Sequence, residues 1–191
     1  MKQLLLLSIA ALLISPAFGQ EGAPKEKAHF QAIIQGGLLT GSSGHAGQLQ
    51  TIQGLRYKTW SAGIGVGIDY YYERSVPLFL QLRKNIFAKP HTPFVYLDGG
   101  GNYPWLKDGV GKSGWMVQKT KGGLYYEAGI GYEVPIFKSS RFVFSAGYSY
   151  KELEQVVNVM PWLSIWPPPA SAFETLNYSM RRIAVKAGLR F

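Results

Sequence analysis

The chain of 191 residues has no cysteine, which excludes a disulfide scaffold and any metal site ligated by thiolates. Only 16% of its residues are charged, which is too few for a disordered basic tail. It also lacks the repeated long apolar runs of a helical membrane bundle. What remains is one globular or barrel domain that is rich in glycine and aromatic residues and carries a net charge of +9.

The N-terminus has the pattern of an export signal. Lys2 is followed by an apolar or small stretch from Leu4 to Ile14, and small residues precede a cleavage point after Gly19. This stretch is shorter than the roughly 20 apolar residues that a transmembrane helix needs. We therefore expect residues 1–19 to be a secretory signal peptide, residues 20–27 a flexible leader, and residues 28–191 the folded domain.

Eight segments after the leader alternate between apolar and polar residues with period two, and turn-forming residues separate them. None shows the apolar stripe of an amphipathic helix. The segments are residues 29–39, 47–58, 60–72, 76–87, 93–103, 122–134, 141–151 and 178–191. The pattern predicts an all-β fold, an eight-stranded antiparallel up-and-down transmembrane β-barrel.

The connections between these segments alternate in length. Tight turns are expected at 58–60, 88–92 and 135–140, whereas the other set includes the long loops 104–121 and 152–177. Short turns at one end and longer loops at the other are typical of an outer-membrane barrel, whose chain enters and leaves on the periplasmic side.

Each segment has one apolar face and one face of glycine, serine and charge. Alternate positions from Trp60 to Tyr72 are apolar or aromatic, and so are those from Ile183 to Phe191. A membrane barrel turns the apolar face to lipid, whereas a soluble barrel turns it inward. Trp60 and Tyr70 lie ten residues apart on the apolar face, and a strand tilted by roughly 40° spans a height of about 25 Å over that length, which matches the lipid band between two aromatic girdles.

The predicted inward face holds charges of both signs. Eight strands leave a lumen only wide enough for side chains, so we expect these charges to pair and to seal the barrel. They are Arg56, Asp69, Arg83, Asp98, Glu127, Glu133, Arg141, Lys186 and Arg190.

Two pairs of these charges flank tight turns almost symmetrically. Arg83 and Asp98 flank the turn at 88–92, and Glu133 and Arg141 flank the turn at 135–140. We expect each pair to lie nearly opposite across its hairpin, on the inward face.

The export signal, the eight amphipathic segments and the closing run from Arg181 to Phe191 resemble the small outer-membrane β-barrel family of gram-negative bacteria, of the OmpX and OmpA-barrel type. The resemblance covers nearly all of the mature chain and implies location in the outer membrane. It also implies that Phe191 and Leu189 belong to the signal that the barrel-assembly machinery recognises. It says little about activity, because such barrels include inert anchors, adhesins and a few lipid-modifying enzymes.

The sequence predicts no catalytic residue, cofactor or metal. The glycines between Gly63 and Gly67 recur every second residue within a strand, so they are expected to make room for large inward neighbours rather than to cradle a phosphate. His29, His45 and His91 are not spaced as metal ligands.

The lysines and arginines form no long basic run, so nucleic acid is not an expected partner. Outer-membrane lipid and anionic lipopolysaccharide are expected partners, although solvated loops are the simpler interpretation of the loop cations. These cations are Arg74, Lys107, Lys112, Lys119 and Lys121.

Two other functions remain as alternatives. A lipid A acylhydrolase or acyltransferase would need a serine and a histidine backed by a carboxylate. The candidate residues for such a site are Ser42, Ser43 and His45, with Asp69 or Glu73 nearby. The His-x-Ser pattern of the barrel deacylases is missing from the sequence. A soluble lipocalin-like carrier is opposed by the inward charges. We expect a non-enzymatic barrel with a structural or surface-interaction role through its long loops.

The last loop is unusually apolar. Residues 160–170 include two tryptophans and four prolines where a solvated loop would be polar. This segment is expected either to fold over the barrel rim or to present an apolar surface to a protein partner or the outer leaflet.

The end of the chain provides a test of assembly. Deletion of Phe191 removes one aromatic girdle contact and the feature that resembles the assembly signal. We expect the shortened chain to accumulate in the periplasm or to be degraded in cells, while the purified chain still refolds in detergent. Cell fractionation with immunoblotting measures this, and normal membrane levels of the shortened chain would show that Phe191 is an ordinary strand residue.

Overall fold

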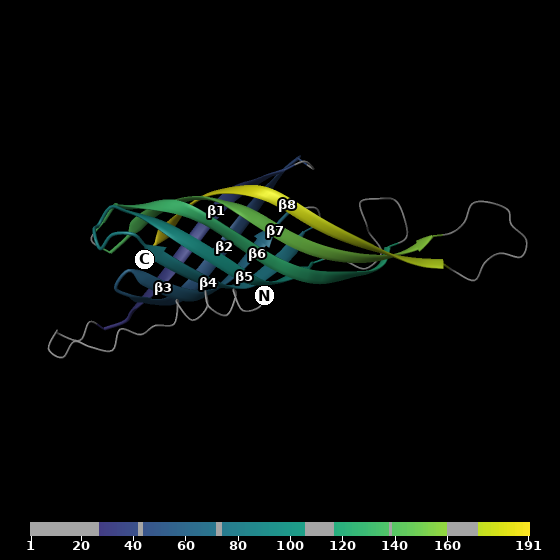
Figure 1. Ribbon diagram of the computed structural model, residues 1–191, viewed down its shortest axis with the longest axis horizontal. Coiled ribbons are helices and arrows are strands. Elements are labelled where there is room, and N and C mark those ends of the chain that lie inside the picture. The colour runs from purple at the N-terminus through teal and green to yellow at the C-terminus, as the bar shows by residue number, and fades with distance from the viewer. Residues whose placement is uncertain (1–26, 42–43, 72–73, 106–116, 138, 160–171) are drawn as a thin grey trace, which may run out of the picture.

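Eight β-strands make up the fold in a computed structural model that describes residues 27–41, 44–71, 74–105, 117–137, 139–159 and 172–191 (Figure 1). In chain order they are β1 (His29–Gly41), β2 (Gly44–Tyr57), β3 (Trp60–Asp69), β4 (Ser75–Asn85), β5 (Thr92–Pro104), β6 (Val117–Pro135), β7 (Arg141–Val159) and β8 (Ala172–Arg190). Among these residues, no helix is long and apolar enough to cross a membrane.

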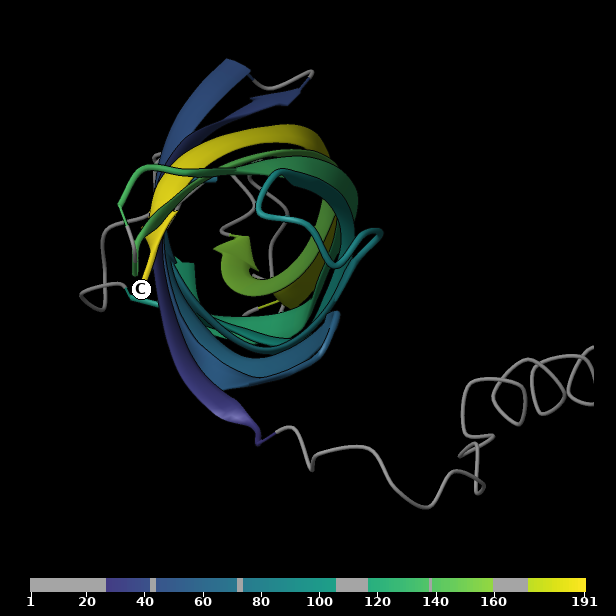
Figure 2. The same ribbon diagram turned by 90° about the vertical axis from the view of Figure 1, so that its left-hand side faces the viewer.

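Each strand pairs with its neighbours in sequence, and the sheet closes on itself. Closure is made by antiparallel pairing of β1 with β8, from Ile33 opposite Arg190 to Thr40 opposite Ile183. The ring of strands is visible when the molecule is viewed along its length (Figure 2). The predicted fold, an eight-stranded antiparallel up-and-down barrel, is confirmed.

The two ends of the barrel differ. Strands β2, β4, β6 and β8 all end at the same end of the barrel (Figure 1). We call it the turn end, because short turns join the first three of these strands to the next strand. The tightest of these turns leaves Tyr57 directly opposite Trp60, and its first residue, Lys58, adopts a left-handed backbone with φ of 55°. The opposite end, where β6, β7 and β8 project furthest, is called the loop end.

The faces of the strands follow the expected parity. Ile64, Leu80 and Ile130 are each more than 60% exposed on the outside, whereas Asp69 and Glu127 are almost completely buried inside. A soluble barrel would show the reverse, so the lipocalin-like arrangement is not the one observed. Exposed aromatic side chains gather toward both ends: Phe30, Tyr57, Trp60, Phe87, Phe137, Phe142 and Phe191 toward the turn end, and Tyr70, Tyr103, Trp105 and Tyr148 toward the loop end.

The predicted boundaries of the two long loops are wrong. Strand β6 begins at Val117 rather than at 122, β7 continues to Val159 rather than ending at 151, and β8 begins at Ala172 rather than at 178. These extensions project beyond the closed barrel (Figure 1). A strand that leaves the lipid band needs no apolar face, so the alternation that marks a strand is lost there while its backbone pairing continues.

The registers of two hairpins differ by two residues from the expectation. Asp98 lies opposite Gln81 rather than Arg83, and Arg141 lies opposite Pro135 rather than Glu133. In both cases the expected partners are diagonal neighbours on the same inward face. Hydrogen bonding inside the turn sets this register, as when the Ile86 N–H donates to the Pro93 carbonyl at 2.9 Å.

Large aromatic side chains fill the lumen where glycine leaves room. A Cβ at Gly65 would collide with the ring of buried Phe79, and one at Gly131 would collide with the ring of Phe94. Phe79 packs in turn on Tyr125, with ring centroids 5.4 Å apart. The glycines of β3 and β6 therefore act as spacers that admit aromatic side chains into a narrow barrel.

Candidate functional site

The polar side chains inside the barrel form three groups along its axis. The group nearest the loop end is built on Asp69, whose carboxylate pairs with the Lys151 ammonium. The Ser75 hydroxyl donates to Asp69 Oδ1 at 2.8 Å, and the Tyr71 N–H donates to the same oxygen at 3.4 Å. The pair is buried and supported by hydrogen bonds on both partners, which is the condition for a tolerable buried ion pair.

Arg182 and Tyr71 complete this group. The Arg182 guanidinium donates to the carbonyls of Tyr71 and Gly44, the latter at 3.0 Å, and lies 4.7 Å from the Tyr71 ring centroid. The Tyr71 hydroxyl donates to the Ser149 carbonyl at 2.8 Å. Burial raises the pKa of this hydroxyl well above its ordinary value, so it remains a neutral donor. These contacts join β2, the segment after β3, β7 and β8 across the barrel.

The middle group is built on Glu127. Its carboxylate lies 2.5 Å from the Lys186 ammonium and accepts hydrogen bonds from the hydroxyls of Tyr96 at 2.7 Å and Tyr125 at 3.1 Å. Lys186 also donates to the Gln50 amide oxygen at 3.3 Å. All of these side chains are buried, so the group is a fully enclosed polar network.

Asp98 lies beside this group but lacks a cation of its own. It sits directly opposite Glu127 in the pairing of β5 with β6. Its Oδ1 accepts a hydrogen bond from the Gln81 amide at 2.9 Å, and its Oδ2 is buried without a partner. The expectation that every inward charge pairs with an opposite charge is therefore not met at Asp98.

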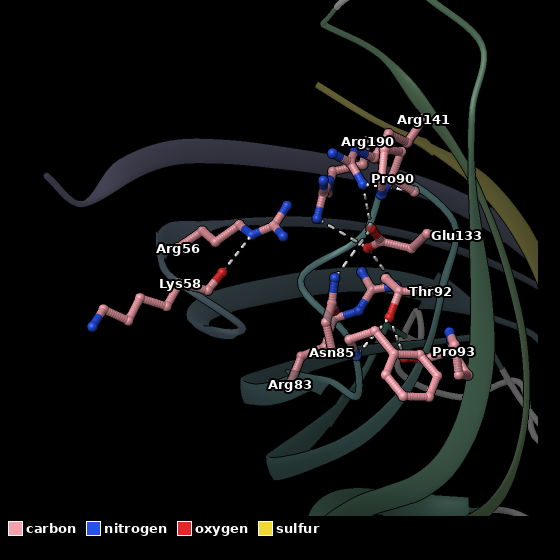
Figure 3. Close-up of polar contacts among 11 residues, drawn as sticks. Arg56, Lys58, Arg83, Asn85, Pro90, Thr92, Pro93, Glu133, Arg141 and Arg190 are labelled. Carbon is pink, nitrogen blue, oxygen red and sulfur yellow. Dashed lines mark hydrogen bonds and ion pairs between the residues drawn. The ribbon is translucent and has the colours of Figure 1, made fainter. Parts of the chain in front are cut away.

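The group at the turn end gathers arginines around a single carboxylate, that of Glu133 (Figure 3). Guanidinium nitrogens of Arg190, Arg83 and Arg141 lie 3.0, 3.2 and 3.7 Å from its oxygens. The Asn85 amide also donates to Glu133, at 3.3 Å. Thus the diagonal placement of Glu133 and Arg141 still allows them to form an ion pair.

Arg56 belongs to the same end but pairs with no carboxylate among the described residues. It is half-buried, and its Nε donates to the Lys58 carbonyl at 3.0 Å. Arg141 is also only partly buried and donates to the Pro90 carbonyl at 2.9 Å. Among the described residues, the arginines of the turn end therefore outnumber the side-chain carboxylates that pair with them.

Two inward cations were missed by the sequence analysis, namely Lys151 and Arg182. Both are buried, and both lie on the inward parity of their strands. Continuing the period-two pattern of β7 by one more step past Ser149 would have identified Lys151. Arg182 shares the parity of Lys186 and Arg190, so the same rule would have identified it.

The residues considered for hydrolytic chemistry are not brought together where the structure describes them. His45 Nδ1 lies 3.1 Å from the Thr40 hydroxyl, while Asp69 is engaged by Lys151, Ser75 and Tyr71. Ser42, Ser43 and Glu73 lie outside the described residues, as do Lys107, Lys112 and segment 160–170. Within the described ranges, no group of three His, Asp or Glu residues could hold a metal ion.

A small cavity of about 10 Å³ lies between the middle and turn-end groups, lined by residues that include Gln35, Phe94 and Lys186. That is about the space one water molecule needs. At this level of the barrel, side chains leave room for about one water molecule.

The barrel is similar to solved outer-membrane proteins. It matches the crystal structure of Neisserial surface protein A with a TM-score of 0.53 and 12% identity, over 86% of this chain and 98% of that one. It matches the solid-state NMR structure of the outer membrane protein AlkL in lipid bilayers with a TM-score of 0.56 and 11% identity, over 93% of this chain and 96% of that one. No family model and no curated protein sequence matches the chain. The resemblance to small outer-membrane barrels is thus confirmed at the level of fold.

The ion pair between Asp69 and Lys151 provides a test of the interior. We expect Asp69→Asn to lower the free energy of unfolding by about 3 kcal/mol, because the Lys151 charge stays buried without its carboxylate. The double variant Asp69→Asn/Lys151→Met is expected to regain most of that loss. Urea unfolding of the detergent-refolded barrel measures both effects.

The matched control is the exposed pair of Lys121 with Glu154, 2.8 Å apart at the loop end. Lys121→Met is expected to cost less than about 1 kcal/mol, because solvent screens that pair. Equal losses in Asp69→Asn and Lys121→Met would contradict the assignment of a buried, mutually dependent pair.

Proposed function

We propose that the chain is a non-enzymatic integral protein of the gram-negative outer membrane, with a sealed polar interior and a surface-interaction role at its loop end. In this proposal residues 1–19 direct export and residues 20–27 form a leader. The observation that carries the proposal is the combination of an apolar outer surface with a closed ring of strands. Such a surface is stable in lipid and unfavourable in water.

The spacing of the outward aromatic side chains supports a location in a lipid bilayer. Trp60 and Tyr70 stand on the outer face at opposite ends of β3 and are 39% and 58% exposed. Between them the outward residues are Ala62, Ile64, Val66 and Ile68. An apolar band between two aromatic positions is the arrangement that bilayers favour.

The filled interior supports a sealed barrel. The middle group of Glu127, Lys186 and two tyrosine hydroxyls crosses the lumen from β5 and β6 to β8. Phe79 and Tyr125 pack against Ile33 and Ile52 beside it. Ion pairs and aromatic side chains at the same level support the proposal that the barrel does not conduct.

The projecting sheet supports a role at the cell surface. Strand β8 pairs with β1 only as far as Ile183, whereas its pairing with β7 continues to Ala172. Strand β6 likewise pairs with β5 only as far as Leu124. Unpaired strand edges are templates for the addition of an extended segment from a partner.

The absence of cysteine allows a direct test of location and orientation. We expect Lys121→Cys, at the loop end, to react with a membrane-impermeant maleimide on intact cells, and Lys89→Cys, in an exposed turn at the other end, to react only after the outer membrane is permeabilised. Immunoblotting of the labelled protein measures the reaction. Equal labelling of the two variants on intact cells would contradict the proposed topology.

The surface role is tested by shortening the projecting hairpin. Leu153 and Tyr178 lie opposite each other, so residues 154–177 can be replaced by an Asn-Gly turn without disturbing the closed barrel. The probe is a library of phage-displayed extended peptides, selected on the intact barrel in nanodiscs. We expect selected peptides to bind the intact barrel and to lose about tenfold or more in affinity for the shortened one, because the strand edge that pairs with them is gone.

A heat-dependent shift in gel migration serves as the folding control for the shortened barrel. Failure to select any peptide, or equal binding of the selected peptides to both barrels, would contradict a role for the projecting sheet.

A further inference from the structure

The turn end of the barrel opens into a polar recess of about 480 Å³. Its lining comes from the starts of β1 and β7 and the ends of β2 and β8, and includes Gln31, Arg56, Lys58, Arg141 and Arg190. Arg141 and Arg190 line the recess and also pair with Glu133, so the Glu133 group stands beside it (Figure 3). The recess is thus formed by the strands on either side of the β1–β8 pairing that closes the barrel.

The charge around this recess is not balanced by the described residues. Arg83, Arg141 and Arg190 share the Glu133 carboxylate, Arg56 pairs with no carboxylate among the described residues, and the terminal carboxylate of Phe191, which also lines the recess, adds only one further negative charge. Lys58 adds a further cation at the rim. Clustered guanidinium groups near a low-dielectric interior repel one another, so an anion that enters the recess is strongly favoured.

Buried polar groups without partners give a second, independent indication. The Gln31 side chain lines the recess, is only 5% exposed, and has its amide oxygen buried without a hydrogen-bond partner. A carboxamide can turn over to present its N–H groups instead. Deeper in the lumen, Arg83 Nε is a buried donor without an acceptor. Native interiors seldom leave such groups unsatisfied, so these atoms indicate a missing partner.

We propose that this recess binds a phosphate group. A phosphate offers several oxygens and up to two negative charges, and it matches the fork of guanidinium donors better than a single carboxylate does. Arg56, Arg141 and Arg190 supply the charge, and Gln31 supplies a neutral donor. The site lies at the opposite end from the projecting sheet, so it is independent of the surface role.

The recess reaches the lipid-facing side of the barrel as well as the lumen. Phe30 and Phe191 line it and are 67% and 53% exposed on the outer surface. The phosphate can therefore come from two sources, either free in solution or carried by the headgroup of a phospholipid in the adjacent leaflet. In the second case the two phenylalanines would contact the glycerol and acyl part.

The test follows the arginine Nε–H signals of the full mature chain by NMR. In one arm inorganic phosphate and then pyrophosphate are titrated at constant ionic strength into the barrel in an uncharged detergent. In the other arm the barrel is placed in nanodiscs of phosphatidylcholine with increasing phosphatidylglycerol. We expect saturable shifts of the Arg56 and Arg190 signals in at least one arm, and the arm that responds identifies the source.

Arg56→Gln is the informative variant, because Arg56 holds no carboxylate whose pairing would be lost. We expect it to weaken phosphate binding about tenfold, the effect of losing one charged hydrogen bond. Arg74→Gln removes the same charge at the loop end, where Arg74 packs 4.9 Å from the Trp105 ring centroid, and is expected to leave binding unchanged.

A heat-dependent gel shift verifies the folding of both variants, and Lys58→Gln replaces Arg56→Gln if the latter does not fold. The absence of saturable shifts in both arms would overturn the proposal. So would equal weakening by the variants at the two ends, since binding would then follow net charge alone.

Discussion

The pairing of β1 with β8 is the constraint on which the rest of the structure depends. It satisfies the backbone groups of the two strands that would otherwise be sheet edges, and in lipid an unsatisfied edge would cost several kcal/mol per group. Closure with eight strands also fixes the width of the lumen. Because that width admits side chains and little else, every inward residue must pack or pair with another inward residue.

The interior meets this requirement unevenly along the axis. Near the loop end Asp69 and Lys151 balance each other, and in the middle Glu127 and Lys186 do so with the help of tyrosine hydroxyls. Near the turn end a single Glu133 serves three arginines. The balance of charge thus differs along the axis: Asp69 and Glu127 each pair with one lysine, enclosed Asp98 has no cation of its own, and the arginines outnumber the side-chain carboxylate where the barrel opens.

Closure also separates the barrel from the sheet that projects from it. Within the ring all strands have two neighbours, whereas β6, β7 and β8 continue beyond it as a three-stranded sheet. Where this sheet leaves the ring, Tyr150 stacks on Tyr126, which still pairs with β5, with ring centroids 4.7 Å apart, and it donates to Ser179 at 3.2 Å. The projecting part continues the pairing of the three strands, with two register shifts between β6 and β7, and it is the physical basis for the proposed role in interaction.

The amino-acid sequence alone determined the number of strands, their direction and the face that each residue occupies. These properties are local, since period two and turn residues can be read within one hairpin, and parity placed residues such as Asp69, Glu127 and Lys186 on the inside. The extent of β6, β7 and β8 could not be found this way, because the outward positions beyond the barrel are no longer apolar, as at Glu152 and Glu154 of β7, although Leu153 and Gln155 stay buried on the inward face. The partners of the inward charges could not be found in this way either. Asp69 and Lys151 lie 82 residues apart in the sequence. Arg83 and Asp98 are offset by two positions because hydrogen bonds in the turn set the register of their hairpin. The tertiary structure decided which charges meet, because closure of the sheet brings together side chains from strands that no local pattern connects.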